Sequence, residues 1–258
     1  MLSRRPLVVA LALAAAGALV VAGIAMAAIN STATFKFSPN KVSKTTPKAG
    51  KLNVHTHTNY SDVNSQYTDR AQLYFDSDVV VNPNALGKCN KTSISGTKTM
   101  KQAMTACGSK LIGTGTALAA AGANTVHACV LAFNGSGTGG HVLLFTRANV
   151  APPFTINCAN PKTNTAGNTN VLLDGALKPA NKPGYGKLLD FQGIHAASAL
   201  PLTDFNVTVG KGAPGATNAT NYVKAKCSHA NKTWKMQTKF TYSAGTQTKN
   251  ATQKCTVG

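Results

Sequence analysis

Hydrophobic and polar residues alternate with a period of two along most of the chain, as in β-strands that bury one face. The alternation predicts strands at Thr34–Phe37, Lys51–Thr58, Ala71–Val81, Thr125–Phe133 and His141–Arg147. Further strands are expected near Val171–Leu177, Gly186–Ile194, Phe205–Val209, Tyr222–Cys227, Thr233–Tyr242 and Gln247–Cys255. Turn-forming residues interrupt the pattern every 8 to 12 residues or so, a spacing typical of all-β sandwiches and jelly rolls.

One short helix is expected at residues 99–107. Met100, Ala103, Met104 and Cys107 recur at helical spacing and form one apolar stripe. Thr97 or Thr99 can cap its start, and Gly108 follows its end. The predicted fold class is therefore all-β, a two-sheet β-sandwich or jelly roll with one short helix.

The last strands separate an apolar face from a basic one. Between Lys232 and Tyr242, one face carries Trp234, Met236, Phe240 and Tyr242, and the other carries Lys235, Gln237 and Lys239. The preceding strand is expected to place Val223, Ala225 and Cys227 on one face, and Tyr222, Lys224 and Lys226 on the other. We interpret the aromatic stripe as core, not as a base-stacking platform.

The N-terminus has the pattern of a secretory signal peptide. Arg4 and Arg5 precede an apolar run from Leu7 to Ala25, and Ala25-Met26-Ala27 is a small-x-small cleavage site. We predict a signal peptide at residues 1–27, with an uncleaved anchor as the alternative because the run is long enough to span a bilayer. Residues 28–258 then form a β-sandwich domain without a further membrane span, with a subdomain break considered at 159–170, a polar stretch.

The charge balance is strongly basic, with a formal net charge of +19, 22 Lys, 4 Arg, 7 Asp and no Glu. Such a surface attracts polyanions, although lysine also keeps β-rich proteins soluble and protects sheet edges. Sequence-specific nucleic-acid recognition is disfavoured, because only Arg70 and Arg147 remain after signal cleavage. A paired-carboxylate mechanism has few candidates; Asp76 and Asp78 would share a strand face and are read as a charged strand end.

Six cysteines in an exported chain indicate three disulfides. They are Cys89, Cys107, Cys129, Cys158, Cys227 and Cys255. Sequence alone allows 15 connectivities for six cysteines, and we favour sequential pairing because each pair brackets one local unit. Metal ligation is the alternative, disfavoured because no C-x-x-C occurs.

His55 and His57 are the candidates considered for a metal site. Residues i and i+2 share a strand face, but this face also carries Lys51, Asn53 and Asn59, so we expect both imidazoles at the solvent. Asp62 could add a carboxylate. Gly135–Gly140 matches G-x-G-x-x-G, but a strand follows it in place of the helix that dinucleotide binding requires. Gly113 and Gly115 are expected to allow tight backbone packing or a bulge.

A further set of short motifs extends along the chain. It comprises Asn84-Ala-Leu-Gly-Lys-Cys89, Ala103-Met-Thr-Ala-Cys-Gly108, Ile112-Gly-Thr-Gly-Thr116, Pro183-Gly-Tyr-Gly-Lys187, Leu202-Thr-Asp-Phe205 and Tyr222-Val-Lys-Ala-Lys-Cys227, followed by Trp234, Phe240-Thr-Tyr242 and Cys255. Together these motifs resemble those of a family of secreted actinobacterial proteins of unknown function. The resemblance spans most of the chain after the signal peptide. It implies an exported, β-rich protein with Cys89–Cys107, Cys129–Cys158 and Cys227–Cys255 bridges, and it supplies no catalytic residue.

We therefore predict an exported, non-catalytic surface or envelope-associated protein without a cofactor. Its basic face, centred on Lys224, Lys226, Lys235 and Lys239, would bind an anionic polymer of the cell envelope. The alternative is a secreted hydrolase or carbohydrate-active module with a metal site at His55 and His57. A third interpretation is a structural or adhesive domain whose charge only secures solubility.

Overall fold

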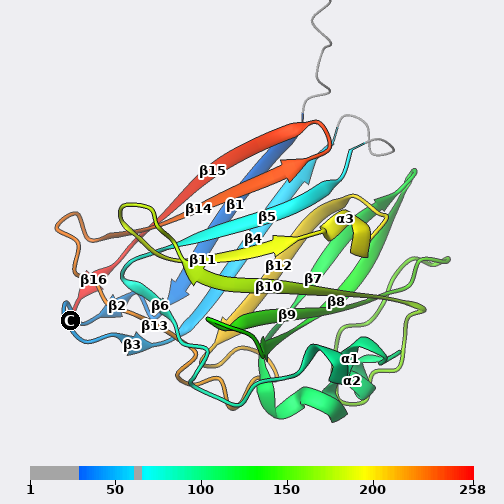
Figure 1. Cartoon of the computed structure of the whole chain (residues 1–258), viewed down its shortest axis with the longest axis horizontal. Helices are drawn as coiled ribbons and strands as arrows, with labels where there is room; N and C mark the ends of the chain where they lie inside the picture. Colours follow the sequence, from blue (N-terminus) through cyan, green and yellow to red (C-terminus); the bar gives the residue numbers. More distant parts are fainter. Residues whose placement is uncertain (1–28, 61–65) are drawn as a thin grey trace, which may run out of the picture.

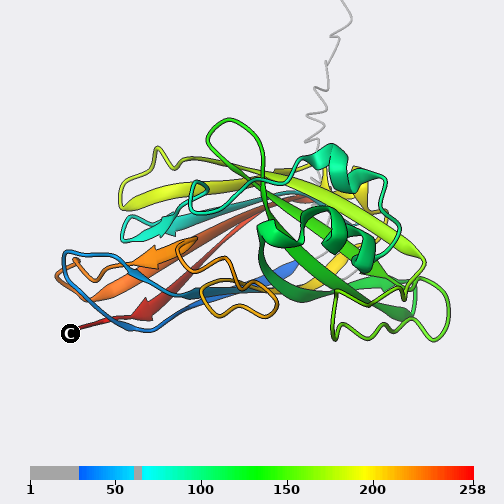
Figure 2. The ribbon, with the colours of Figure 1, turned by 90° about the horizontal axis from the view of Figure 1, so that it is seen from below.

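The computed structural model describes residues 29–60 and 66–258. The predicted signal peptide and Asp62 lie outside these residues. The main feature of the described chain is one antiparallel sheet of eleven strands, which curves strongly around an apolar interior (Figures 1 and 2). None of the helices that the structure describes is long and apolar enough to cross a membrane.

The strands follow one another across the large sheet in an order that mixes near and distant parts of the chain. In spatial order they are β1 (Asn30–Ser38), β4 (Lys51–Asn59), β12 (Leu202–Gly210), β7 (Leu111–Ala121), β8 (Asn124–Gly135), β9 (His141–Ala148), β10 (Thr169–Pro179), β11 (Tyr185–Gln192), β5 (Thr68–Asp76), β14 (Thr233–Tyr242) and β15 (Gly245–Lys254). A smaller sheet contains β3 (Lys48–Ala49), β13 (Val223–Ala225) and β6 (Val79–Val81), and β2 (Lys41–Val42) pairs with β16 (Thr256–Val257).

The curvature brings the two edge strands, β1 and β15, side by side (Figure 1). The contact between them uses side-chain amides. Gln253 Oε1 accepts from Phe37 N–H at 2.6 Å, and Gln253 Nε2 donates to Phe37 C=O at 2.8 Å. Gln247 Oε1 accepts from Ser31 N–H at 3.2 Å, and Gln247 Nε2 donates to Ile29 C=O. We call these two glutamines and their four hydrogen bonds the glutamine clasp.

The outer face of β8 and β9 carries a second apolar layer. Leu131 pairs with Phe145 and Phe133 with Leu143, and all four side chains are fully buried. The helices α1 (Lys91–Ser95) and α2 (Met100–Cys107) lie on this side of the sheet (Figure 2). Thr99 caps α2 by accepting from Gln102 N–H at 3.1 Å, and the predicted stripe of Met100, Ala103, Met104 and Cys107 is buried. A third helix, α3 (Ile194–Ala197), follows β11.

The predicted all-β class and the helix near residues 99–107 are confirmed. In place of two packed sheets, the structure has one continuous sheet, and the inner faces of its two halves line the same interior.

β7 was not predicted as a strand, because Gly113 and Gly115 interrupt its alternation. At both glycines an added Cβ would lie within 2.1 Å of a backbone oxygen of β12, so the close packing expected there is present. Residues 149–168 connect β9 to β10, which pair directly, so both sides of the considered subdomain break belong to one sheet.

The placement of Tyr222 on the basic face is wrong, since its side chain is only 1% exposed. β13 begins one residue later, and a series of tight turns precedes it. Backbone N–H groups of Ala216, Ala219 and Tyr222 each donate to the carbonyl three residues earlier. Inward positions in this segment therefore recur every third residue, at Ala213, Ala216, Ala219 and Tyr222, and all four are buried.

Candidate functional site

The four lysines of the predicted basic face come from two different sheets. Lys235 and Lys239 lie on the outer face of β14, opposite the buried Met236, Thr238 and Phe240. Lys224 belongs to β13 of the small sheet, and Lys226 follows it. Lys226 Nζ lies 3.9 Å from Asp78 Oδ1, so its charge is partly offset.

The outer face of β14 continues into a patch of lysines and tyrosines. Lys235 Nζ lies 4.7 Å from the ring centre of Tyr185, and Lys182 Nζ lies 5.2 Å from the ring of Tyr74 and 5.5 Å from that of Tyr185. The two rings meet edge to face at 6.0 Å. We call Tyr74, Lys182, Tyr185, Lys235 and Lys239 the lysine–tyrosine patch.

Positive charge in this patch has no direct neutralising partner in the described chain. Among residues 29–60 and 66–258, no carboxylate lies within ion-pair distance of Lys182, Lys235 or Lys239. Cations over aromatic faces gain a modest attraction while the ammonium remains open to solvent. Burial, with the negative charge of Asp76, raises the pKa of Tyr185, so this phenol stays neutral. The patch therefore offers ammonium groups without a carboxylate partner beside two aromatic surfaces, and the Lys182 ammonium donates to Gln237 Oε1.

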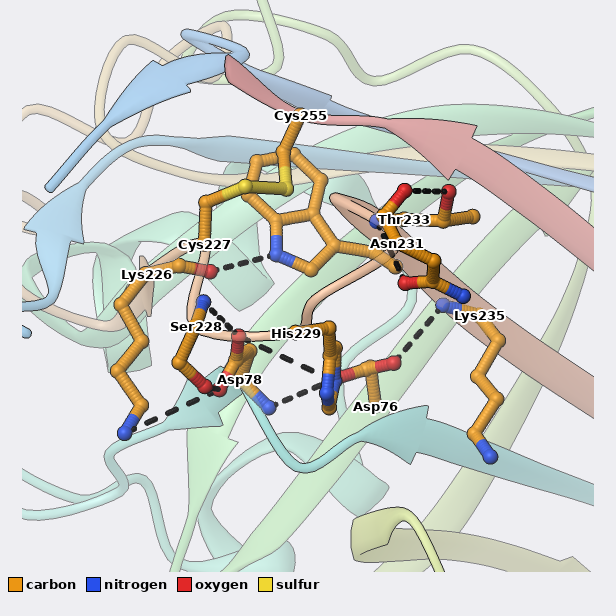
Figure 3. Close-up of a disulfide and its surroundings, with 11 residues drawn as sticks. Asp76, Asp78, Lys226, Cys227, Ser228, His229, Asn231, Thr233, Lys235 and Cys255 are labelled. Carbon is orange, nitrogen blue, oxygen red and sulfur yellow. Dashed lines mark hydrogen bonds and ion pairs between the residues drawn. A yellow bond between two sulfur atoms is a disulfide. The ribbon is translucent and has the colours of Figure 1, made fainter. Parts of the chain in front are cut away.

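A buried acidic cluster lies next to the patch (Figure 3). Asp76 ends β5, and Asp78 follows in the turn to β6. The prediction that both lie on one strand is therefore wrong. His229 Nε2 lies 2.6 Å from Asp76 Oδ1, and both carboxylates are nearly inaccessible to solvent. Lys226 and Lys235 lie on opposite sides of the cluster (Figure 3).

Asp76, Asp78 and His229 could together ligate a metal ion by donor type and proximity. Each carboxylate oxygen already accepts a hydrogen bond, however. Asp76 Oδ1 accepts from Asp78 N–H at 2.8 Å, and its Oδ2 accepts from Lys235 N–H at 3.0 Å. Asp78 accepts from the Ser228 N–H and hydroxyl, both at 2.6 Å. Because buried carboxylates require such donors, we assign the cluster a structural role: it fastens the β5–β6 turn to the segment beside the Cys227–Cys255 bridge.

His55 and His57 lie together on the outer face of β4, with side chains 40% and 43% exposed. Asp204 of β12 joins them, since its Oδ2 is 2.8 Å from His55 Nε2 and 3.4 Å from His57 Nδ1. His57 Nε2 also lies 3.0 Å from Asn59 Oδ1. The carboxylate next to these histidines thus comes from a neighbouring strand, which sequence spacing could not show.

All six cysteines form disulfides, and the predicted sequential pairing is confirmed. The pairs are Cys89–Cys107, Cys129–Cys158 and Cys227–Cys255. Three disulfides are typical of proteins that work in an oxidising, extracellular environment.

The chain matches no family model, and no match was found among curated proteins or solved structures. The resemblance to secreted actinobacterial proteins therefore stays a prediction.

Several residues of these sites were not nominated from the sequence. Tyr74 sits in a strand whose alternation was recognised, but its role depends on β11 lying beside β5. Tyr185 and Lys182 flank a Pro-Gly turn, a signal for a turn but not for a binding surface. The φ of +77° at Gly184 and its lack of a Cβ leave room for the Lys235 amino group, which would lie 2.3 Å from an added Cβ. The patch thus depends on long-range pairing.

Proposed function

We propose that the protein is a non-catalytic, envelope-associated binding protein whose lysine–tyrosine patch holds an anionic polymer. The observation that carries the proposal is the position of the Lys182 and Lys235 amino groups over tyrosine rings, without a carboxylate partner among the described residues. Lysine ammonium groups bind anionic chains by charge and not by fixed bidentate geometry, which suits a repetitive polymer. Tyrosine faces add apolar contact area beside the charges.

The experiment measures binding of the purified protein to isolated bacterial envelope between low salt and about 1 M salt. We expect binding to fall steeply as salt rises, because polyanion association is driven largely by release of counterions. The variant with Lys235→Gln and Lys239→Gln should bind at least tenfold more weakly at low salt and show a shallower salt dependence.

A matched control removes the same charge elsewhere. Lys101 on α2 and Lys162 in the β9–β10 connection are exposed and lie away from the patch, so Lys101→Gln with Lys162→Gln changes the net charge equally. This control should retain most of the affinity. An equal loss of affinity in both double variants would show that binding depends on net charge and not on the lysine–tyrosine patch. Binding that does not change with salt would overturn the proposal.

A second candidate, a hydrolase or carbohydrate-active module, is favoured by His55, His57 and Asp204 alone. Two imidazoles and a carboxylate are a usual donor set for zinc. Metal analysis of the purified protein is the test: about one zinc per chain, lost in the variant with His55→Ala and His57→Ala, would favour this function over polymer binding.

A further inference from the structure

The inner face of the curved sheet lines an apolar cavity of about 110 Å³. Its lining comes from both halves of the sheet, for example from Leu52 and Val54 of β4, Phe75 of β5, Ala132 of β8, Phe191 of β11 and Val207 of β12. Its open surface is wholly apolar. An engineered apolar cavity of about 150 Å³ remains dry and binds benzene, so a cavity of this size and lining can hold a small apolar group.

The cavity is elongated along the strands. On β12 its lining runs from Leu202 to Val209, which at roughly 3.3 Å per residue corresponds to a length of roughly 23 Å. Ile194 of α3 lines it at the end near Leu202, and Tyr222 and Val223 line it at the end near Val209. A narrow, long and apolar space fits an unbranched aliphatic chain better than a compact ring.

The ring of Tyr222 lines one end of this cavity, and its hydroxyl lies behind the ring edge without adding polar surface to the cavity. This hydroxyl is buried and has no hydrogen-bond partner within residues 29–60 and 66–258. A buried hydroxyl without a partner is unfavourable, and burial raises the pKa of Tyr222, so the group stays a neutral donor. Because the oxygen is enclosed, a ligand atom that pairs with it must shift the ring slightly, which gives binding a local signal.

No charged side chain lines the cavity. A carboxylate or an ammonium group would lose its hydration there without gaining an opposite charge, which is strongly unfavourable. A neutral oxygen, in contrast, needs only one hydrogen bond.

From these observations we propose that the interior binds an unbranched aliphatic molecule with one neutral oxygen group, an alcohol or a carbonyl, whose oxygen pairs with the Tyr222 hydroxyl. The site lies on the opposite face of the sheet from the lysine–tyrosine patch and does not depend on the function proposed for that patch.

The experiment uses 1-hexanol, n-hexane and hexanoate as probes. Binding to the folded protein is followed by NMR of the methyl groups that line the cavity and of the Tyr222 ring. We expect 1-hexanol to bind at one site and to shift both sets of signals, and hexanoate not to bind at pH 7.5. Tyr222→Phe should weaken 1-hexanol about fivefold, the usual effect of one neutral hydrogen bond, and leave n-hexane unchanged.

Two further variants separate the cavity from other effects. Tyr242→Phe also removes a buried hydroxyl, but this one bonds to Ser31 and Thr58 and does not line the cavity, so 1-hexanol affinity should not change. Ala132→Leu should fill the cavity and abolish binding of both neutral probes. The proposal is overturned if 1-hexanol leaves the lining methyl signals unmoved, if Tyr222→Phe binds it as tightly as the unmodified protein, or if hexanoate binds equally well.

Discussion

Asp190 is a fully buried carboxylate surrounded by cationic donors on the outer face of β11. Arg70 donates to it through Nε at 2.7 Å and through a second guanidinium nitrogen at 2.8 Å, and Lys178 Nζ lies at 2.9 Å. Gln192 donates a further bond at 3.1 Å. Burial by itself would raise the pKa of Asp190, but these hydrogen bonds outweigh it and hold the pKa well below its usual range.

Asp190→Asn is expected to lower the free energy of unfolding by about 1.5–3 kcal/mol at pH 6, the range for hydrogen bonds to charged groups. The folded-state pKa lies below the unfolded-state value of about 3.9. The contribution is therefore full above that value and is lost as the pH falls below it toward the folded-state pKa. Urea unfolding between pH 6 and pH 2 should show the free energies of unfolding of Asp190→Asn and of the unmodified protein becoming equal as the pH falls.

Asp69→Asn is the control for this comparison, since no ion pair to Asp69 occurs in the described chain. It should change stability little at any pH. A gap between Asp190→Asn and the unmodified protein that stays constant down to pH 2 would contradict the assignment of Asp190.

Tyr222 and Tyr242 should respond oppositely to loss of the hydroxyl. Tyr222→Phe removes a buried polar group without a partner, so the free energy of unfolding should rise by about 1 kcal/mol. Tyr242→Phe removes hydrogen bonds of 2.5 Å to Ser31 and 3.3 Å to Thr58, and should lower it by a similar amount. Urea titration of both variants measures the difference, and equal destabilisation would show that Tyr222 has a partner after all.

The inward position of Tyr222 could have been predicted from the sequence with a different period. Ala213, Ala216, Ala219 and Tyr222 are spaced by three, with Gly, Pro, Thr and Asn between them. Alternation with a period of two describes extended strands only, so it failed in a segment built from consecutive turns. Arg70, which pairs with Asp190, and His55, which pairs with Asp204, lie far away along the chain from these carboxylates and left no local signal.

At the scale of elements, the glutamine clasp joins strands that are more than 200 residues apart in sequence. Gln247 and Gln253 are on the same face of β15 as Ala251, pointing to the side of the buried Trp234, Met236 and Phe240. Each amide supplies one donor and one acceptor to the backbone of β1. Two side chains thus replace part of a backbone ladder.

Gln253→Ala should lower the free energy of unfolding by about 1–2 kcal/mol, because it leaves Phe37 N–H and C=O without these partners. Hydrogen exchange at the Phe37 amide should accelerate as well. Thr252→Ala is the control on the same strand, since Thr252 is exposed on the opposite face. Unchanged Phe37 exchange in Gln253→Ala would mean that the clasp does not hold the edges together.

Most strands could be predicted because one face of each packs on the interior and the other faces solvent. β7 could not be predicted as a strand. Gly113 and Gly115 occupy inward positions of β7, where larger apolar residues would have produced the alternating pattern. The order of strands was also out of reach, because neighbours such as β5 and β14 are separated by most of the chain.

Considered as a whole molecule, the protein carries its covalent bridges in parts of the core away from the cavity lining. None of the six cysteines lines the interior cavity. Cys129 of β8 instead anchors Cys158 of the β9–β10 connection, across 29 residues. The cavity lining among the described residues is therefore held by packing and strand pairing, without a disulfide in it.

Replacing Cys129 and Cys158 by Ala should lower the free energy of unfolding by about 2–4 kcal/mol, the usual effect of losing one disulfide. Hydrogen exchange should rise mainly in residues 149–168, whereas the affinity for 1-hexanol should persist. Loss of 1-hexanol binding in the folded variant would show that the bridge shapes the interior.

The glutamine clasp also bears on how separate copies of the protein meet. An unpaired edge strand is a template on which another chain can add a strand. In the described sheet, the edge groups of Ile29, Ser31 and Phe37 are already occupied by amides from the same molecule. An opened clasp would free two long edges at once, each able to pair with its counterpart on another copy. Loss of Gln247 and Gln253 is therefore expected to favour self-association through these edges.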